Sequence, residues 1–390
     1  LVKSMYCGFI VIAVFARFHL ATIFKIAYES LSDSETIRLV VVTAGITGLG
    51  HLLKVIGSFD SITTNLKSIF SDLRIIIAII PALVGLLVVP GGAIISAPLI
   101  EQLGNEVDLD KNTLATANII FRHVNSYISP MSSGMILMSS VSSVDIKEFI
   151  KFNLPLMMLV MPLAFFYLLR KTDIVRKKKN GFQLGPFVEL IRHLSPFIII
   201  VLFNLVLKVP FHFVIIIGIF YVILFAEGKT HSATSLKERA YVTLKGIKLD
   251  MILGIIGIMA FKDMIVATGY LDEISLMIVN LRVPLFLLVF IIPFMIGLMI
   301  GNTGAAIGLS VPVFMPLIPV GSSGVPYYCL LYIASVTSYL LSPFHLCLIL
   351  TIEYFKASFS NVIKKVGIVG SWVTILSFIR FLFIVYKIGF

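Results

Sequence analysis

The sequence has few charged residues for its length, and this shortage narrows the class of protein. Only 13% of its 390 residues are charged, well below the roughly 25% that soluble domains carry. Hydrophobic residues make up 58% of the chain and the mean hydropathy is +1.05. Such a chain has too little polar surface to face water on all sides, so we expect an all-α polytopic membrane protein.

Patterns that bind metals are also lacking. The cysteines Cys7, Cys329 and Cys347 lie in apolar segments and form no CxxC pair, and the seven histidines are scattered without an HExxH motif. Isolated cysteines in apolar surroundings behave as small buried hydrophobic residues. The sequence therefore predicts no zinc site, no disulfide and no cofactor.

The net charge of +11 gathers largely in two stretches, residues 171–194 and 227–245. Cytoplasmic loops of membrane proteins carry such an excess of Lys and Arg. We therefore interpret "RKKKN" at 176–180 as a determinant of topology, with a binding patch as the alternative. The interpretation predicts that both basic loops are cytoplasmic, that the chain lies in the inner membrane of a prokaryote, and that it binds no nucleic acid.

One phrase occurs twice in the chain. Residues 79–93 read "IIPALVGLLVVPGGA", and residues 291–305, 212 positions later, read "IIPFMIGLMIGNTGA". The same offset places Gly57 on Gly269, and "SYISP" at 126–130 falls on "SYLLSP" at 338–343 with one residue inserted. Shared apolar bias would explain matching Ile and Leu but not matching Gly, Ser and Pro, so the pattern indicates an internal repeat.

The repeat divides the chain into four regions. They are an N-terminal transmembrane segment at 1–36, with its span at 5–24; repeat 1 at 37–170, with a re-entrant hairpin at about 72–106 and a broken helix at about 112–141; basic loops and a connecting transmembrane hairpin at 171–245, with spans at 195–208 and 210–226; and repeat 2 at 246–390, with a hairpin at about 284–320 and a broken helix at about 326–355. An odd number of crossings separates the repeats, which predicts inverted topologies, as in many secondary transporters.

The two hairpin tips are predicted to meet near the middle of the bilayer. These are Pro90-Gly91-Gly92 and Asn302-Thr303-Gly304. Irregular backbone inside a membrane is tolerated only where it is packed in protein or lines a polar cavity. Helix N-termini at such tips suit an anion, and carbonyl groups of unwound segments suit sodium, which we place at Asn302, Thr303 and Gly304.

The broken helices supply further candidates for binding the solute. Ser129-Pro130 with Ser132 marks one break, and Ser342-Pro343 with His345 marks the other. Because the breaks occupy equivalent positions in the two repeats, we favour a binding role over simple kinks.

Two charged residues lie inside apolar segments. Arg122 shares a helix face with Asn118 and Ser129, and its guanidinium could bind a carboxylate; a structural or snorkelling arginine is equally compatible with the pattern. Asp263 could couple transport to protons or sodium, but the adjacent Lys262 equally favours an ion pair that joins helices.

At these residues the sequence resembles the ion-transporter superfamily of secondary permeases, which includes citrate, gluconate, dicarboxylate and arsenite-type carriers. "GNTGAAIGLSVPVFMPL" at 301–317 is similar to the second-hairpin motif of that superfamily. "VVPGGAIISAPLIE" and "ANIIFRHVNSYISP" are similar to an uncharacterised prokaryotic branch known only as a domain of unknown function. The first tip departs from the Ser-Asn-Thr pattern of the superfamily at Pro90-Gly91-Gly92.

The resemblance implies a homodimer in which a scaffold holds a mobile transport domain that moves as an elevator. It implies import or export of a small anion, an organic carboxylate or an oxyanion, coupled to sodium or protons. A passive channel is the alternative function. An intramembrane enzyme is disfavoured, because it would need a nucleophile with a base, and nothing in the sequence places Ser132 or Ser133 beside His345.

Overall fold

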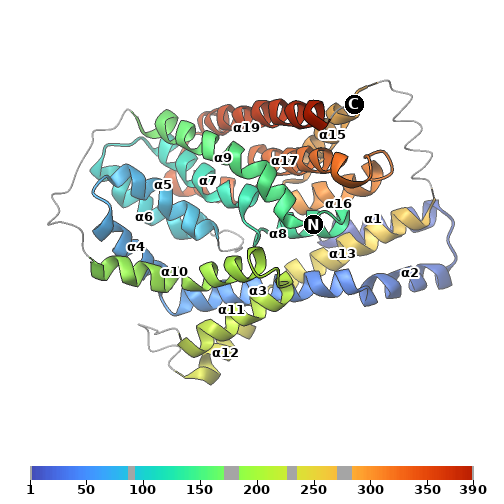
Figure 1. Ribbon diagram of the computed structural model, residues 1–390, viewed down its shortest axis with the longest axis horizontal. Helices are drawn as coiled ribbons and strands as arrows, with labels where there is room; N and C mark the ends of the chain where they lie inside the picture. Colours follow the sequence, from blue (N-terminus) through green and yellow to red (C-terminus); the bar gives the residue numbers. More distant parts are fainter. Residues whose placement is uncertain (1, 87–92, 171–183, 226–234, 270–282, 389–390) are drawn as a thin grey trace.

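The computed structural model describes residues 2–86, 93–170, 184–225, 235–269 and 283–388, and every regular element in these ranges is a helix (Figure 1). Several are long and apolar enough to cross a membrane. Those stretches are Ser34–Val55, Ile146–Leu169, Leu184–Asn204, Gly321–Phe355 and Phe359–Val385. The all-helical, apolar architecture predicted from the composition is therefore confirmed for the described part of the chain.

The N-terminal region forms two helices instead of one span. Helix α1 covers Val2–Phe15 and α2 covers Leu20–Ser32. Arg17 between them adopts a left-handed backbone with φ of 55°, a conformation that ends a right-handed helix. The predicted single span over residues 5–24 is therefore wrong. Both short helices pack against α13, Leu249–Ala267 (Figure 1).

The basic segments are more helical than predicted. Helix α10 runs from Leu184 to Leu205, so the predicted loop 171–194 is wrong for its last eleven positions, 184–194. Helix α12, Leu236–Lys245, occupies the end of the predicted loop 227–245. A capping box between Ser235 and Glu238 starts α12, because each side chain accepts the backbone amide of the other residue. Residues 171–183, with the RKKKN stretch, and 226–234 lie outside the described residues.

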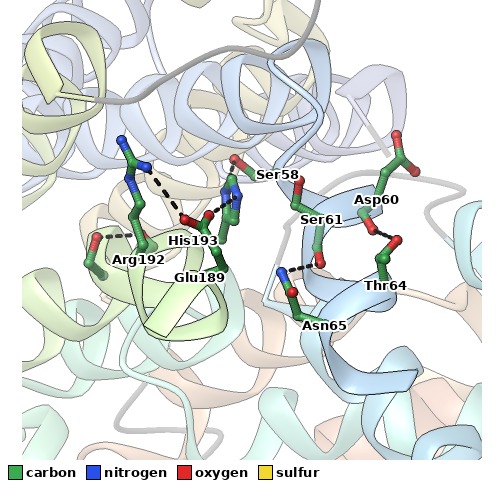
Figure 2. A network of polar contacts seen from close by, with 9 residues as sticks. Ser58, Asp60, Ser61, Thr64, Asn65, Glu189, Arg192 and His193 are labelled. Atoms are coloured by element: carbon green, nitrogen blue, oxygen red, sulfur yellow. Dashed lines mark hydrogen bonds and ion pairs between the residues drawn. The ribbon is translucent and has the colours of Figure 1, made fainter. Parts of the chain in front are cut away.

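The early part of α10 is helical because it packs against another helix. Figure 2 shows its His193 beside α4, Ser58–Ile69. The His193 Nδ1 atom lies 3.4 Å from the Ser58 hydroxyl, and Nε2 lies 3.8 Å from the Glu189 carboxylate one turn earlier. These polar contacts extend α10 beyond its apolar part, which a hydropathy pattern does not reveal.

Helix bounds recur between the two halves of the chain at nearly the 212-residue offset. The corresponding pairs are α3 (Ser34–Val55) with α13, α5 (Leu73–Gly85) with α15 (Leu285–Ile300), α6 (Ala93–Glu106) with α16 (Thr303–Phe314), α7 (Lys111–Ile128) with α17 (Val325–Leu341), α8 (Ser133–Ser142) with α18 (Leu346–Phe355), and α9 (Ile146–Leu169) with α19 (Phe359–Ile388). Helix α11, Phe211–Phe225, and a 3₁₀ turn at Gly321–Ser323 complete the described elements.

Both interrupted helices are closed by the same serine turn. Helix α7 ends at Ile128, where the Ser129 hydroxyl accepts the Met131 amide at 3.2 Å and its carbonyl accepts the Ser132 amide at 3.0 Å. The Ser342 hydroxyl likewise accepts the Phe344 amide, and its carbonyl accepts the His345 amide, each at 3.1 Å. The turns satisfy amides that lose their helical acceptors where the helices are interrupted.

Glycines at equivalent positions allow α5 to approach α7 and α15 to approach α17 closely. A Cβ atom on Gly85 would lie 2.2 Å from the Arg122 carbonyl oxygen, and one on Gly297 would lie 2.1 Å from the Ser338 hydroxyl. The first contact is with backbone, which cannot rotate away. In Figure 1, α5, α6 and α7 lie together at the left, and α15, α16 and α17 lie together at the right.

We expect Gly85→Ala to lower the free energy of unfolding by about 1–3 kcal/mol, because the added methyl group overpacks a rigid contact. Gly297→Ala should have a similar or smaller effect, since the Ser338 side chain can rotate. Thermal unfolding in detergent, followed by intrinsic fluorescence, measures both.

Gly185→Ala is the matched control, because no atom lies within 4 Å of the added methyl group. An equal loss of stability in Gly85→Ala and Gly185→Ala would contradict the packing argument.

Candidate functional site

A cavity of about 380 Å³ lies where the α7–α8 break meets the start of α16. Helices α13, α17 and α18 and the end of α5 complete its wall. Its lining is mixed, with polar groups at the helix breaks and apolar side chains elsewhere. The described lining residues are Gly85, Leu86, Arg122, His123, Asn125, Ser126, Ser129, Met131, Ser132, Ser133, Gly134, Leu137, Met251, Gly254, Ile255, Ile258, Gly301, Asn302, Thr303, Gly304, Val336, Tyr339, Phe344, Leu346 and Cys347.

Half of the predicted binding residues line this cavity. These are Arg122, Ser129, Ser132, Asn302, Thr303 and Gly304. The predicted first tip, Pro90, Gly91 and Gly92, lies outside the described residues. Asn118, Ser342, His345 and Asp263 are described but are not among the lining residues.

The N-termini of two helices from different halves of the chain meet at the cavity. A Cβ atom on Gly134, in the first turn of α8, would lie 3.1 Å from the Thr303 Cγ2 atom at the start of α16. The first amides of a helix have no intrahelical acceptor, and the helix dipole places partial positive charge there. Both starts line the cavity, so this part of the wall favours negative charge.

Asn302 caps the helix that it precedes. Its side-chain oxygen accepts the Ala305 amide at 2.9 Å, and Asn302 has an extended backbone with φ of −147°. Gly301 just before it has φ of 67° and ends α15. The tip is thus a left-handed glycine followed by an asparagine N-cap, and the Asn302 oxygen predicted as a sodium ligand is already used within the protein.

Arg122 brings a fixed positive charge to the cavity wall. Its side chain is 5% exposed and extends from α7 towards Cys347 and Tyr339, which neighbour its guanidinium. Burial of a guanidinium is costly unless polar groups or an anion compensate it. Arg122 therefore lines the same cavity as the two helix starts.

The outer end of α7 is anchored separately from the cavity. Asp110 caps the helix by accepting the Thr113 amide at 3.0 Å, and Lys365 of α19 lies 3.8 Å from its carboxylate. Burial alone would raise the pKa of Asp110, but the hydrogen bonds from Thr113 and the attraction of Lys365 hold that pKa below its usual value. These contacts fix the axial position of α7 and hence of Arg122.

Asn118 lies behind the cavity and ties helices together. Its side-chain amide donates to the Ala93 carbonyl at 3.0 Å, and its oxygen accepts the Ser96 hydroxyl at 2.6 Å. A longer contact of 3.4 Å reaches the Thr351 hydroxyl of α18. Asn118 is fully buried, and its polar atoms are occupied by protein groups in this structure.

Three other predicted residues also lie away from the cavity lining. The Ser342 hydroxyl donates to the Leu298 carbonyl at 2.7 Å, which joins the second break to α15. His345 is fully buried and packs on Tyr339, with ring centres 3.9 Å apart. Asp263 forms an ion pair with the adjacent Lys262, whose Nζ lies 3.1 Å from the Asp263 Oδ1 atom.

Tyr339 and Cys347 line the cavity although the sequence analysis did not select them. The sequence predicts all three cysteines as small buried hydrophobic residues. Cys329 and Cys347 are buried, whereas the prediction is wrong for Cys7, which is exposed. Cys347 follows the second break by only a few positions, and this nearness to His345 is the sequence signal that could have drawn attention to it. Tyr339 belongs to the repeated SYLLSP motif, and its match to Tyr127 is the corresponding signal.

Comparisons with known proteins give a family and a fold. The family model described as "protein of unknown function (DUF401)" matches residues 3–384. The crystal structure of the Alcanivorax borkumensis YdaH transporter matches with a TM-score of 0.62 and 12% identity, covering 94% of this chain and 89% of that chain. No curated protein shows a significant match. The chain therefore shares its fold with that transporter.

We expect Asn302→Ala to lower the free energy of unfolding by about 0.5–2 kcal/mol, because the Ala305 amide loses its cap. Asn302→Ser should retain most of the stability, since a serine hydroxyl can cap the same amide. The comparison uses thermal unfolding in detergent without any added solute.

The two variants distinguish capping from other uses of the residue. Equal stabilities of Asn302→Ala and Asn302→Ser would show that the cap contributes nothing measurable.

Proposed function

This chain belongs to the DUF401 family, and we propose that it is a secondary active transporter that moves a small anion across the membrane. The proposed solute is an organic carboxylate or an oxyanion, and its movement is coupled to sodium or protons. The observation that carries the proposal is the cavity in which Arg122 and the N-termini of α8 and α16 share one lining.

The chemistry of the cavity favours a small anion. Two helix starts contribute partial positive charge, and Arg122 contributes a full charge with planar donors that match a carboxylate. Ser129, Ser132 and Thr303 add hydroxyl groups that can donate or accept hydrogen bonds. A volume of about 380 Å³ lies near the lower end of the range for small-molecule pockets.

The repeated helix order supports inverted repeats and alternating access. Equivalent helices recur near the 212-residue offset, and both broken helices close with the same serine turn. In the proposal, α5–α6 and α15–α16 are re-entrant hairpins that enter from opposite sides. They move with the broken helices as a transport domain, elevator fashion, against a scaffold within a homodimer.

Sodium or a proton is the proposed coupling ion. Candidate sodium ligands are the backbone carbonyls around Asn302 to Gly304 and the Thr303 hydroxyl, since the Asn302 oxygen serves the cap. Asp263 is the proposed proton-coupling alternative, although its pairing with Lys262 favours a structural role. Pro90, Gly91 and Gly92 remain proposed partners of the solute at the first tip.

A carrier accounts for these features better than the alternatives do. A passive channel is the second candidate, and it requires a continuous polar path, whereas opposed hairpin tips suit alternating occlusion. An intramembrane enzyme would need a base beside Ser132, but the Ser132 hydroxyl lies 3.4 Å from the Tyr332 hydroxyl, and His345 packs on His123 and Tyr339. We propose no catalytic function and no nucleic-acid partner.

The proposed location is the inner membrane of a prokaryote. Large apolar side chains of α9, α10, α11 and α19 are exposed in the monomer, as expected for surfaces that face lipid or a second copy of the chain. The basic residues of 171–194 and 227–245 are proposed to face the cytoplasm.

Currents across solid-supported membranes loaded with proteoliposomes test the function directly. Small carboxylates and oxyanions are applied with and without a sodium gradient and across a range of pH. A current that needs both one anion and one of the two gradients supports the proposal. Electroneutral exchange produces no current, so it is measured by counterflow of a radiolabelled anion. The absence of both a current and counterflow for every anion would contradict the proposal.

We expect Arg122→Gln to lower the apparent affinity for a transported anion by about tenfold or more, because a charge-assisted hydrogen bond is lost. The exposed Arg38→Gln is the matched control, and it should leave the affinity unchanged. An equal loss for anionic and neutral solutes would instead assign Arg122 a structural role.

Thr303→Val should reduce sodium-coupled transport strongly, because the side chain keeps its shape but loses its hydroxyl. Thr303→Ser restores the hydroxyl and should recover most of the sodium dependence. The measurement is initial uptake as a function of sodium concentration. Unchanged sodium dependence in Thr303→Val would place the coupling ion elsewhere.

A further inference from the structure

Two histidines and a cysteine meet beside the cavity in an arrangement that the proposed anion transport does not use. His123 comes from α7, and His345 and Cys347 come from the start of α18. All three are buried, and one potential ligand atom from each lies within 4.8 Å of the others. His123 lies 222 positions before His345 in the sequence, so only the fold brings it to the other two residues.

The orientation of His123 leaves one nitrogen available for a ligand. Its Nδ1 atom lies 2.8 Å from the Ile119 carbonyl oxygen, which can only accept, so Nδ1 carries the proton. The Nε2 atom then has a free lone pair. Histidines that bind metals typically donate their other ring nitrogen to such a carbonyl or carboxylate, which fixes both the tautomer and the ring orientation.

His345 provides a second, independent indication of a ligand. It is fully buried; one ring nitrogen faces the Leu340 backbone carbonyl, and the other has no hydrogen-bond partner among the described residues. Buried polar atoms without partners cost free energy and call for an explanation such as an ion. The ring is held by its neighbours, with ring centres 4.8 Å from His123 and 3.9 Å from Tyr339.

We propose that His123, His345 and Cys347 form a binding site for a soft monovalent metal ion, Cu(I). Thiolate and imidazole are ligands that suit copper. Binding replaces the Cys347 S–H bond with an S–Cu bond, and the released proton leaves through the cavity. The copper stays in its reduced state, so the step needs no oxidant or reductant.

Charge favours Cu(I) over Zn²⁺ at this position. The Arg122 guanidinium contacts Cys347 and already places one positive charge beside the cluster. Cu(I) with one thiolate is neutral overall, whereas Zn²⁺ with one thiolate would add a net positive charge to a buried site next to that arginine. Like charges in a poorly solvated interior repel strongly.

The site has an entrance and needs only a small contraction. His123 and Cys347 line the cavity, while His345 lies behind them, so an ion can approach from the cavity side. Metal–nitrogen and metal–sulfur bonds of about 2.0–2.3 Å require ligand atoms somewhat closer than the present 4.8 Å limit. Rotation of the Cys347 side chain can supply part of this adjustment.

The test measures Cu(I) binding to the purified full chain in detergent under reducing, oxygen-free conditions. Bathocuproine disulfonate competes for the ion and sets its free concentration. We expect the unmodified protein to retain one Cu(I) per chain. Cys347→Ser and His345→Phe should weaken binding by at least the roughly ten- to hundredfold that loss of an outer-shell partner of a metal ligand costs.

Controls separate loss of ligands from loss of fold. Cys329→Ser removes another buried cysteine outside the cluster and should keep full binding. His345→Phe preserves the packed ring, and a single symmetric peak in size-exclusion chromatography checks each variant. X-ray absorption of the copper-loaded unmodified protein should show one sulfur and two imidazole neighbours, independently of any variant.

Several outcomes would overturn the proposal. They are the absence of retained Cu(I), equal binding by the unmodified protein and Cys347→Ser, a copper environment without sulfur, or retention of Zn²⁺ in preference to Cu(I). The assay contains no anionic solute and no membrane gradient, so its result does not depend on whether the chain transports anions.

Discussion

Every backbone amide and carbonyl that leaves a helix inside the membrane needs another partner, and this requirement shapes the centre of the molecule. Lipid offers no hydrogen bonds, so an interrupted helix survives only if side chains, other backbone groups or a polar cavity replace the lost ones. Ser129 and Ser342 supply that replacement at the two breaks, each with its hydroxyl and its carbonyl. Asn302 does the same at the start of α16.

The same constraint explains why the candidate binding groups lie where helices are interrupted. Helix starts that are exposed to a cavity retain amides that an anion can satisfy, and the glycines beside them allow close approach of neighbouring backbone. Ser129, which stabilises the first break, also lines the cavity, whereas Ser342 at the second break does not. Asn118 and Ser342 illustrate the division, since both are polar and central, yet their hydrogen bonds join helices and leave the cavity to Ser129, Ser132 and Thr303.

Much of the fold could be predicted from the sequence because its signals are local. Ser-Pro pairs place the ends of α7 and α17, and the repeated phrase places the two helix pairs that flank them. The bend at Arg17 was missed, since nothing in that residue type favours a left-handed backbone. The helical parts of the basic segments were missed as well, because packing of His193 on α4 and the capping box at Ser235 outweigh low hydropathy there.

The candidate site was predictable only in part, for a geometric reason. Arg122, Ser129 and the Asn302–Gly304 tip stand at breaks or carry a charge in apolar surroundings, and both features are visible in the chain. Tyr339 and Cys347 enter the lining because α17 and α18 fold over α7. Such a meeting depends on the tertiary arrangement, and no spacing within one segment reveals it.

The residue inserted before Pro343 makes the two halves unequal. Ser132 and His345 occupy the same position in their serine turns, yet Ser132 lines the cavity and His345 is buried behind it. One added residue turns a helix by about 100°, which changes the direction that the following segment takes. The equivalent helices of the two halves therefore present different side chains at equivalent places, so the cavity wall is chemically asymmetric although the order of helices repeats.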